Sequence, residues 1–175
     1  MARRSSLKEY QDEILRKMEA ARSASDGVAE QLRYFGFASA GKKFLVDASK
    51  IVEMTAVARL QPIPMAKPWA VGAANIKGSV YSVTDFGILF AGVSTKSGKF
   101  IIINDELVTG SALLIEGLTG IYDRETIGNP LSSDDLSGLP DWVSGVYLFN
   151  NDRHYLISLE KLIEDDRFIK LQSGD

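Results

Sequence analysis

The sequence contains no cysteine and a single histidine, His154. Without cysteine there are no disulfides, thiolate metal sites or cysteine nucleophiles, and one histidine leaves little scope for histidine-based metal sites or catalytic triads. His154 follows a turn-forming segment, residues 150–152, and begins an alternating segment typical of a strand. We therefore expect a barrel-end or surface position for His154 and no catalytic role.

Long apolar runs and an excess of basic charge are also missing. No apolar run approaches the roughly 20 residues that span a bilayer, and residues 1–6 lead into a charged segment, unlike a secretory signal. The net charge of −3 offers no basic face for nucleic acid or an anionic membrane. We expect a cytoplasmic protein that neither binds nucleic acid nor inserts directly into a membrane.

The residues that are present have the composition of an ordinary globular protein. Of 175 residues, 45% are hydrophobic and 25% are charged, which suits one domain or two small subdomains that share a core. We predict an N-terminal helical extension and linker over residues 1–27, a β-rich domain over residues 28–170 and a tail over residues 171–175.

The first segment has the pattern of an amphipathic helix. Residues 6–9 match a capping box, so we predict a helix over residues 6–22 and a serine- and glycine-containing linker over residues 23–27. Its narrow apolar stripe could dock on the main body, on a second copy or on a partner's helix. The stripe consists of Leu7, Tyr10, Ile14, Met18 and Ala21.

From residue 32 onward the pattern changes to short β-rich segments separated by turn residues. A short helix at residues 85–90, a long polar loop at 123–140 and a closing helix at 159–169 complete the prediction. Because closed sheets leave no exposed edges, this many short strands favours an all-β fold of two small barrels packed side by side. Strands are predicted at residues 33–38, 43–46, 50–57, 100–104, 111–115, 118–122, 144–149 and 154–158.

Residues 68–86 contain the most distinctive pattern of the chain. Two apolar runs flank Asn75-Ile76-Lys77-Gly78, which predicts a hairpin whose turn contains Gly78. The stretch resembles the signature of CheW-like domains: a Trp-x-x-Gly segment, then Asn-Leu-Arg-Gly, then a strand ending in Asp-Leu. Lys77 stands where the family usually has arginine, and Ser82 where proline is common. The signature positions matched here are Trp69, Gly72, Asn75, Gly78 and Asp85.

The resemblance, which extends over roughly residues 31–170, implies a fold and a function. The implied fold is two five-stranded SH3-like barrels with apolar side chains between them and strands that can be exchanged. The implied function is a non-enzymatic scaffold, without a cofactor, that couples the cytoplasmic tip of a chemoreceptor to the regulatory domain of a CheA-like histidine kinase. The N-terminal extension and Lys77 resemble the PilI-type variants of type IV pilus twitching-motility systems.

The resemblance also implies a protein-binding surface. Ile51 and Glu53 lie two apart in a predicted strand, so we expect both on one exposed face. In the family, the matching apolar and acidic positions and the basic residue of the Asn-Leu-Arg-Gly motif belong to partner-binding surfaces. The predicted protein-binding residues are Ile51, Glu53, Gly72, Asn75, Lys77 and Gly78.

Two other functional hypotheses remain at this stage. Residues 36–42, GFASAGK, match the first seven positions of a phosphate-binding loop, which would suit a small β-barrel enzyme or a nucleotide-binding protein. Lys43 replaces the magnesium-binding Ser or Thr, and residues 44–46 continue as a strand, so a hairpin turn is the favoured interpretation. The third hypothesis is an unrelated peptide-binding β-module.

Two acidic pairs and the two tryptophans are further candidates for a functional role. The acidic pairs Asp134-Asp135 and Asp165-Asp166 lack the ligand spacing of a calcium loop, so we interpret them as solvated faces. Trp69 and Trp142 each begin an apolar run, which favours core packing, with an interface anchor as the alternative.

Overall fold

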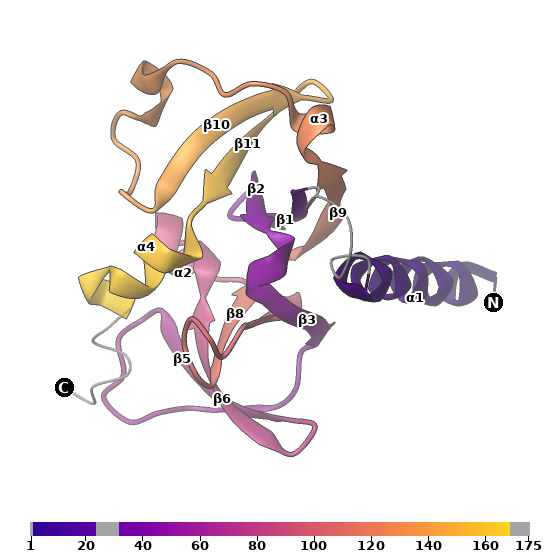
Figure 1. Cartoon of the computed structure of the whole chain (residues 1–175). Helices are drawn as coiled ribbons and strands as arrows, with labels where there is room; N and C mark the ends of the chain where they lie inside the picture. The colour runs from indigo at the N-terminus through magenta and orange to yellow at the C-terminus, as the bar shows by residue number, and fades with distance from the viewer. Residues whose placement is uncertain (1, 24–31, 169–175) are drawn as a thin grey trace.

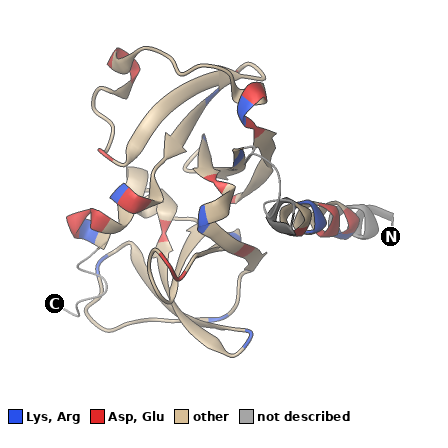
Figure 2. Ribbon diagram, viewed as in Figure 1, with Lys and Arg blue, Asp and Glu red and all other residues tan. Residues whose placement is uncertain are grey.

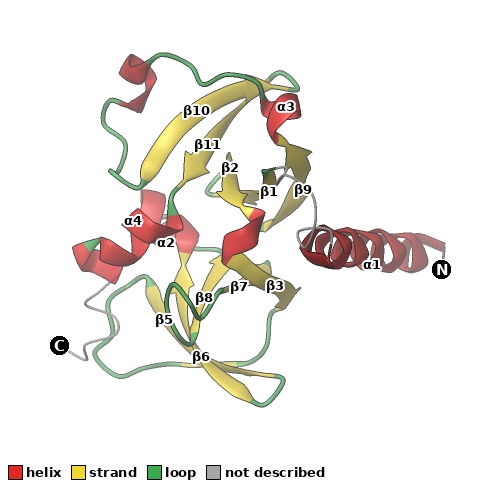
Figure 3. Ribbon diagram, in the orientation of Figure 1, coloured by secondary structure: helices red, strands yellow, loops and turns green. Residues whose placement is uncertain are grey.

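The computed structural model describes residues 2–23 and 32–168, which form two β-sheets with a long helix beside them (Figure 1). Strands dominate and the helices of the main body are short (Figure 3), as the sequence predicts for an all-β fold. The elements in chain order are α1 (Ala2–Ser23), β1 (Arg33–Ser39), β2 (Lys42–Asp47), η2 (Ala48–Lys50), β3 (Ile51–Ala56), β4 (Leu60–Gln61), β5 (Ala70–Ile76), β6 (Ser79–Asp85), α2 (Phe86–Ala91), β7 (Lys99–Ile103), β8 (Ser111–Ile115), β9 (Gly117–Asp123), α3 (Arg124–Ile127), η3 (Ser133–Leu136), β10 (Val143–Phe149), β11 (Asp152–Ile157) and α4 (Leu159–Glu164).

Each sheet is built from strands that lie far apart in the sequence. The first has the order β10-β11-β2-β1-β9, so the first two strands of the chain join the last three. The second has the order β3-β7-β8-β6-β5-β4, in which β4 is only two residues long. The predicted architecture of two small SH3-like barrels is confirmed, with this short sixth strand as the one addition.

Three tight hairpins connect neighbouring strands. In each, both turn residues have positive φ: Ala40 and Gly41, then Lys77 and Gly78, then Asn150 and Asn151. Two consecutive residues with positive φ are characteristic of a type I′ turn, whose twist matches that of the flanking strands. The hairpin turns predicted at these three places are confirmed.

The two sheets share one apolar core. Phe37 of β1 and Phe44 of β2 pack against Phe86 of α2, with ring centroids 5.1 and 4.8 Å from that of Phe86. The same cluster includes Ile101 of β7 and Trp142, whose exposed fraction is 1%. Core packing is therefore confirmed for Trp142. This cluster draws on both sheets and joins them, while a smaller cluster lies within each sheet, around Ile76 in the second and around Leu45 in the first.

Helix α1 packs against the body of its own chain. Ile14 is 7% exposed, and Met18 packs against the main core cluster. The helix begins at Ala2, four residues before the prediction, so Ser6 lies inside it and the predicted capping box is wrong. Alanine and arginine are good helix formers, which explains the extra turn. The side chains of Leu7 and Ala21, the linker residues 24–27 and the tail 171–175 lie outside the described residues.

The loop predicted at residues 123–140 contains two short helices that the sequence did not indicate. These are α3 and the 3-10 helix η3, in which Ser132 Oγ accepts a hydrogen bond from the Asp134 amide. The closing helix α4 ends at Glu164, before the predicted end at residue 169, which is not described. Acidic and basic residues occur on α1, α3 and α4, whereas most of each strand is uncharged (Figure 2).

Candidate functional site

An exposed ion pair joins two residues that the sequence analysis placed in the binding surface. Lys77 Nζ donates a hydrogen bond to Glu53 Oε2 at 2.7 Å. The side chain of Lys77 is 70% exposed and that of Glu53 is 28% exposed. The hydrogen bond to Glu53, followed by its Coulomb attraction, raises the pKa of Lys77. Solvent screens such a pair, so it adds little to stability and remains accessible to a partner.

The turn of the β5–β6 hairpin determines where Lys77 is placed. Lys77 has φ of 51° and Gly78 of 88°, and Asn75 Oδ1 accepts a hydrogen bond from the Gly78 amide at 3.0 Å. A Cβ on Gly78 would have no atom within 4 Å, so only its backbone angle calls for glycine. Asn75 and Gly78 therefore shape the turn that presents Lys77.

Gly72 has an architectural role in the second sheet. Its φ is +143°, and a Cβ at this position would lie 2.5 Å from the carbonyl oxygen of Gln61. Only glycine tolerates this conformation and this close approach of β4. Gly72 is also buried, so its predicted direct contact with a partner has no support from its position.

The expectation that Ile51 is exposed beside Glu53 is wrong. Ile51 is 1% exposed and belongs to the main core cluster. The pairing of β3 with β7 shifts register between Ile51 and Glu53, which pair with neighbouring residues of β7. A bulge of this kind breaks the alternation of faces along a strand. The apolar residue that faces outward here is Val52, which is 37% exposed.

The other signature residues hold the backbone around α2. Asp85 is 1% exposed, and its carboxylate accepts hydrogen bonds from the amides of Gly87 at 2.9 Å and Thr95 at 2.8 Å. Its own amide donates to the Trp69 carbonyl, and Trp69 Nε1 donates to the Arg167 carbonyl at 3.0 Å. Trp69 is partly buried against the core, so most of the signature stabilises the fold.

A groove that the sequence did not reveal lies beside the Glu53–Lys77 pair. Its volume is about 270 Å³, and one wall comes from α1 while the other comes from the second sheet. The groove arises from the docking of α1, which no local sequence pattern could indicate. Its lining residues are Lys8, Gln11, Asp12 and Leu15 of α1 together with Glu53, Met54, Thr55, Ala56, Lys77 and Lys99.

The phosphate-loop hypothesis is contradicted by the structure. Residues 36–42 run from β1 through the Ala40–Gly41 turn into β2, and β2 pairs with β1 along its length. A phosphate loop must end at a helix N-terminus, and no helix follows here. The hairpin interpretation is confirmed.

His154 is buried, which corrects the expectation of a barrel-end or surface position. It is 1% exposed and stacks on Phe149, with ring centroids 3.8 Å apart and an interplanar angle of 16°. Its Nδ1 lies 3.1 Å from the Asp152 carbonyl oxygen, and burial lowers the pKa of the imidazole. Burial gives this histidine a packing role.

The described part of the chain contains no group of three or more His, Cys, Asp or Glu side chains arranged to hold a metal ion. Over the same residues, no helix has the length and apolar character needed to cross a membrane.

Two SH3-like sheets that are joined by a core and present a charged pair between a hairpin turn and β3 define a β-module with an exposed polar surface. The family model of the CheW-like domain matches residues 33–167, and the chain therefore belongs to the CheW-like domain family. That family comprises scaffold and adaptor proteins of chemotaxis-type signalling.

The fold is also similar to that of a solved structure. The crystal structure of the scaffolding protein TtCheW from Thermoanaerobacter tengcongensis matches with a TM-score of 0.62 and 17% sequence identity. The match covers 78% of this chain and 95% of that one. No curated protein matches the chain significantly.

Proposed function

We propose that this chain is a cytoplasmic, non-enzymatic adaptor that couples the tip of a chemoreceptor to the regulatory domain of a CheA-like histidine kinase. The observation that carries the proposal is the exposed pair between Glu53 of β3 and Lys77, which lies at the tip of the hairpin that contains the family signature. Family membership supports the adaptor class, and the position of the pair supports a specific surface.

The rigid support behind the pair suits a scaffold. Asn75 and Gly78 fix the turn, and Ile76, 6% exposed, anchors it in the second sheet's core. A partner carboxylate can compete with Glu53 for the ammonium group of Lys77, while Val52 offers adjacent apolar area. Charged contacts of this kind determine how the two proteins align and how fast they associate. The signal then passes as shifts in the conformational populations of the bound partners.

The proposal covers two pathways, chemotaxis and type IV pilus twitching motility. The N-terminal helix and Lys77 favour the pilus pathway, since both are the features that resemble the PilI-type variants. Two pairs of partners from the organism that supplies this chain distinguish the pathways. Each pair consists of a receptor tip and a kinase regulatory domain, one pair from each pathway, and binding is compared between the pairs. An unrelated peptide-binding module would bind none of these four proteins.

The first prediction concerns Lys77. Lys77→Glu replaces attraction to a partner carboxylate by repulsion, so it should weaken binding to the kinase regulatory domain or the receptor tip by about tenfold or more. Lys77→Arg should retain binding because it keeps the charge, and the wild-type affinity should fall with added salt. Isothermal titration calorimetry measures all of these affinities.

Lys96→Glu is the matched control, because Lys96 is exposed in the segment after α2. The same reversal of charge there should leave both affinities unchanged. Equal affinities for the wild type and Lys77→Glu would show that this surface does not bind either partner.

A further inference from the structure

Helix α1 lies against the surface that the proposed function uses. In Figure 1 it stands beside β3, and its residues Lys8, Gln11, Asp12 and Leu15 face the groove that Glu53 and Lys77 also line. Within the described residues, β3 pairs only with β7, so it is an edge strand of the second sheet. Unpaired edges attract further strands or partner segments, and a covering helix is one way in which proteins protect them.

Among the side chains of α1 that the structure describes, few apolar ones are buried against the body. Ile14 is buried and Met18 packs against the core, whereas Tyr10 is 55% exposed. The ion pair between Lys17 and Glu13, 3.3 Å, lies within the helix. Elements held by few buried apolar contacts open more easily than the core. The contacts of α1 should therefore break more easily than the contacts within and between the two sheets.

The charges in the groove suit competition with an acidic partner. Asp12 of α1 lines the same groove as the basic side chains of Lys77 and Lys99 on the opposite wall. A partner segment that reaches from Lys77 to Lys99 must enter the space that α1 borders. There it meets the steric bulk of the helix, which lines the groove with one basic and one acidic side chain, Lys8 and Asp12.

We propose that α1 is an intramolecular cover for Glu53 and the edge of β3, which a partner that contacts the exposed Lys77 must displace before it binds along that edge. This inference rests on the proposed function of that surface. The apparent dissociation constant then equals the intrinsic constant divided by the fraction of molecules with α1 undocked. Undocking α1 by mutation therefore increases affinity for the partner.

The test compares two variants of the full chain. Ile14→Asp places a charge at the buried contact of α1, and Tyr10→Asp introduces the same charge at an exposed position of the same helix. Titration with the regulatory domain of the CheA-like kinase from the same organism should show about threefold to tenfold tighter binding by Ile14→Asp. Tyr10→Asp should bind like the wild type.

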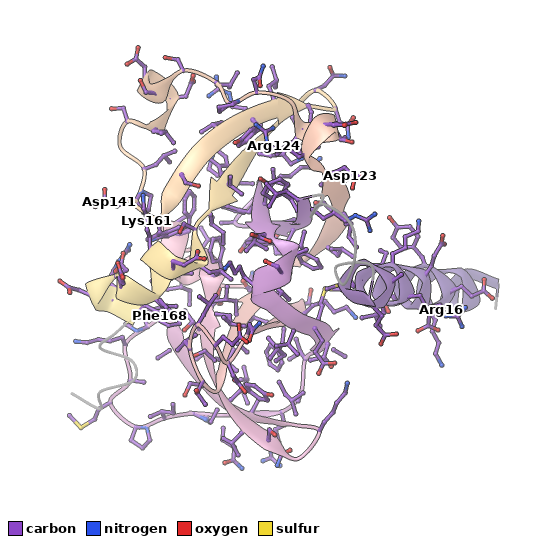
Figure 4. All side chains as sticks on the ribbon, viewed as in Figure 1. Arg16, Asp123, Arg124, Asp141, Lys161 and Phe168 are labelled. Atoms are coloured by element: carbon purple, nitrogen blue, oxygen red, sulfur yellow. The ribbon has the colours of Figure 1, made fainter. Side chains whose placement is uncertain are left out.

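A second measurement follows the position of α1 in a protein whose docking residue, Ile14, is unchanged. The chain has no cysteine, so Arg16→Cys and Leu148→Cys provide unique sites for a pair of fluorescent labels, on α1 and on β10. Both native side chains are exposed, and Figure 4 labels Arg16 on α1. Energy transfer between the labels should change when the kinase domain saturates the protein.

The outcomes separate this inference from the proposed function. Equal binding by the wild type and Ile14→Asp, or energy transfer that stays constant at saturation, would refute the cover while the adaptor function stands. Weaker binding by Ile14→Asp would show that α1 contributes to the binding site instead of covering it. Absence of binding by every variant would overturn both.

Discussion

At the scale of single residues, the predicted binding set separates into residues that shape the surface and residues that form it. Gly72, Asn75 and Gly78 determine backbone geometry, whereas Glu53 and Lys77 expose charge to solvent. Substitutions in the first group should change stability, and substitutions in the second should change binding. The sequence motif alone could not distinguish the groups, because Lys77 lies directly between the turn residues Asn75 and Gly78.

The second prediction concerns the two neighbours Ile51 and Val52. Ile51→Ala removes a fully buried side chain from the core, which typically lowers the free energy of unfolding by about 2 to 5 kcal/mol. Val52→Ala removes a side chain that is 37% exposed and should change it by no more than about 0.5 kcal/mol. Urea denaturation measures both values, and similar losses for the two variants would contradict the bulge.

The third prediction concerns the pH dependence that results from His154. Burial lowers its pKa in the folded protein below the ordinary value of 6.5. Below that pH the unfolded chain therefore binds a proton that the folded chain does not, and stability falls as the pH decreases from about 7 to about 5. His154→Phe, which can still stack on Phe149, should flatten the dependence in this window.

The charged groups around His154 do not titrate in that window. The hydrogen bond from Lys43 lowers the pKa of Asp152 below 3.8 and raises that of Lys43 above 10.5. The stability associated with Asp152 is therefore lost only at more acidic pH. Thermal denaturation of the wild type and His154→Phe across the window provides the measurement, and parallel curves would rule out His154 as the cause.

At the scale of elements, the sequence predicted what periodicity and turn chemistry specify. The strands are short β-rich segments bounded by turn residues, so all were expected except β4, which has only two residues. The bulge in β3 was missed because it depends on pairing with β7. The helices α3 and η3 were missed because a single turn contains too few residues to show a period of 3.6.

The fourth prediction concerns the approach of β4 to β5 at Gly72. Gly72→Ala would place a Cβ 2.5 Å from the Gln61 carbonyl oxygen and keep a φ that is strained for alanine. We therefore expect it to lower the free energy of unfolding by about 2 kcal/mol or more. Gly41→Ala is the control, since φ there is also positive but no atom lies within 4 Å of the added Cβ. Gly41→Ala should lower the free energy of unfolding by about 1 kcal/mol. Equal losses in urea denaturation would show that the close approach has no energetic consequence.

At the scale of the whole molecule, the sequence did not indicate which strands share a sheet. Pairing of β2 with β11 joins residues more than a hundred positions apart, and local pattern carries no information about such contacts. The same limit applies to the groove, since the position of α1 depends on where Ile14 and Met18 find apolar surface. The number of short strands favoured two barrels, and only the family resemblance indicated that strands can be exchanged between them.

The shared core leads to the fifth prediction, that the two sheets unfold as one cooperative unit. Phe37 and Phe44 of the first sheet and Ile101 and Leu113 of the second belong to one cluster with Phe86 between them. Native-state hydrogen exchange should therefore give the slowest amides of β2 and β7 the same opening free energy, within about 1 kcal/mol. Phe86→Ala should lower both by about 3 to 5 kcal/mol.

The matched control is Leu148→Ala, which removes a side chain that is 56% exposed on β10 and should leave both values unchanged. A decrease confined to the amides of one sheet in Phe86→Ala would mean that each sheet is stable by itself. The protein would then be two linked modules able to reorient. A single cooperative unit holds the Glu53–Lys77 pair in a fixed position relative to the first sheet, as a scaffold with two partners requires.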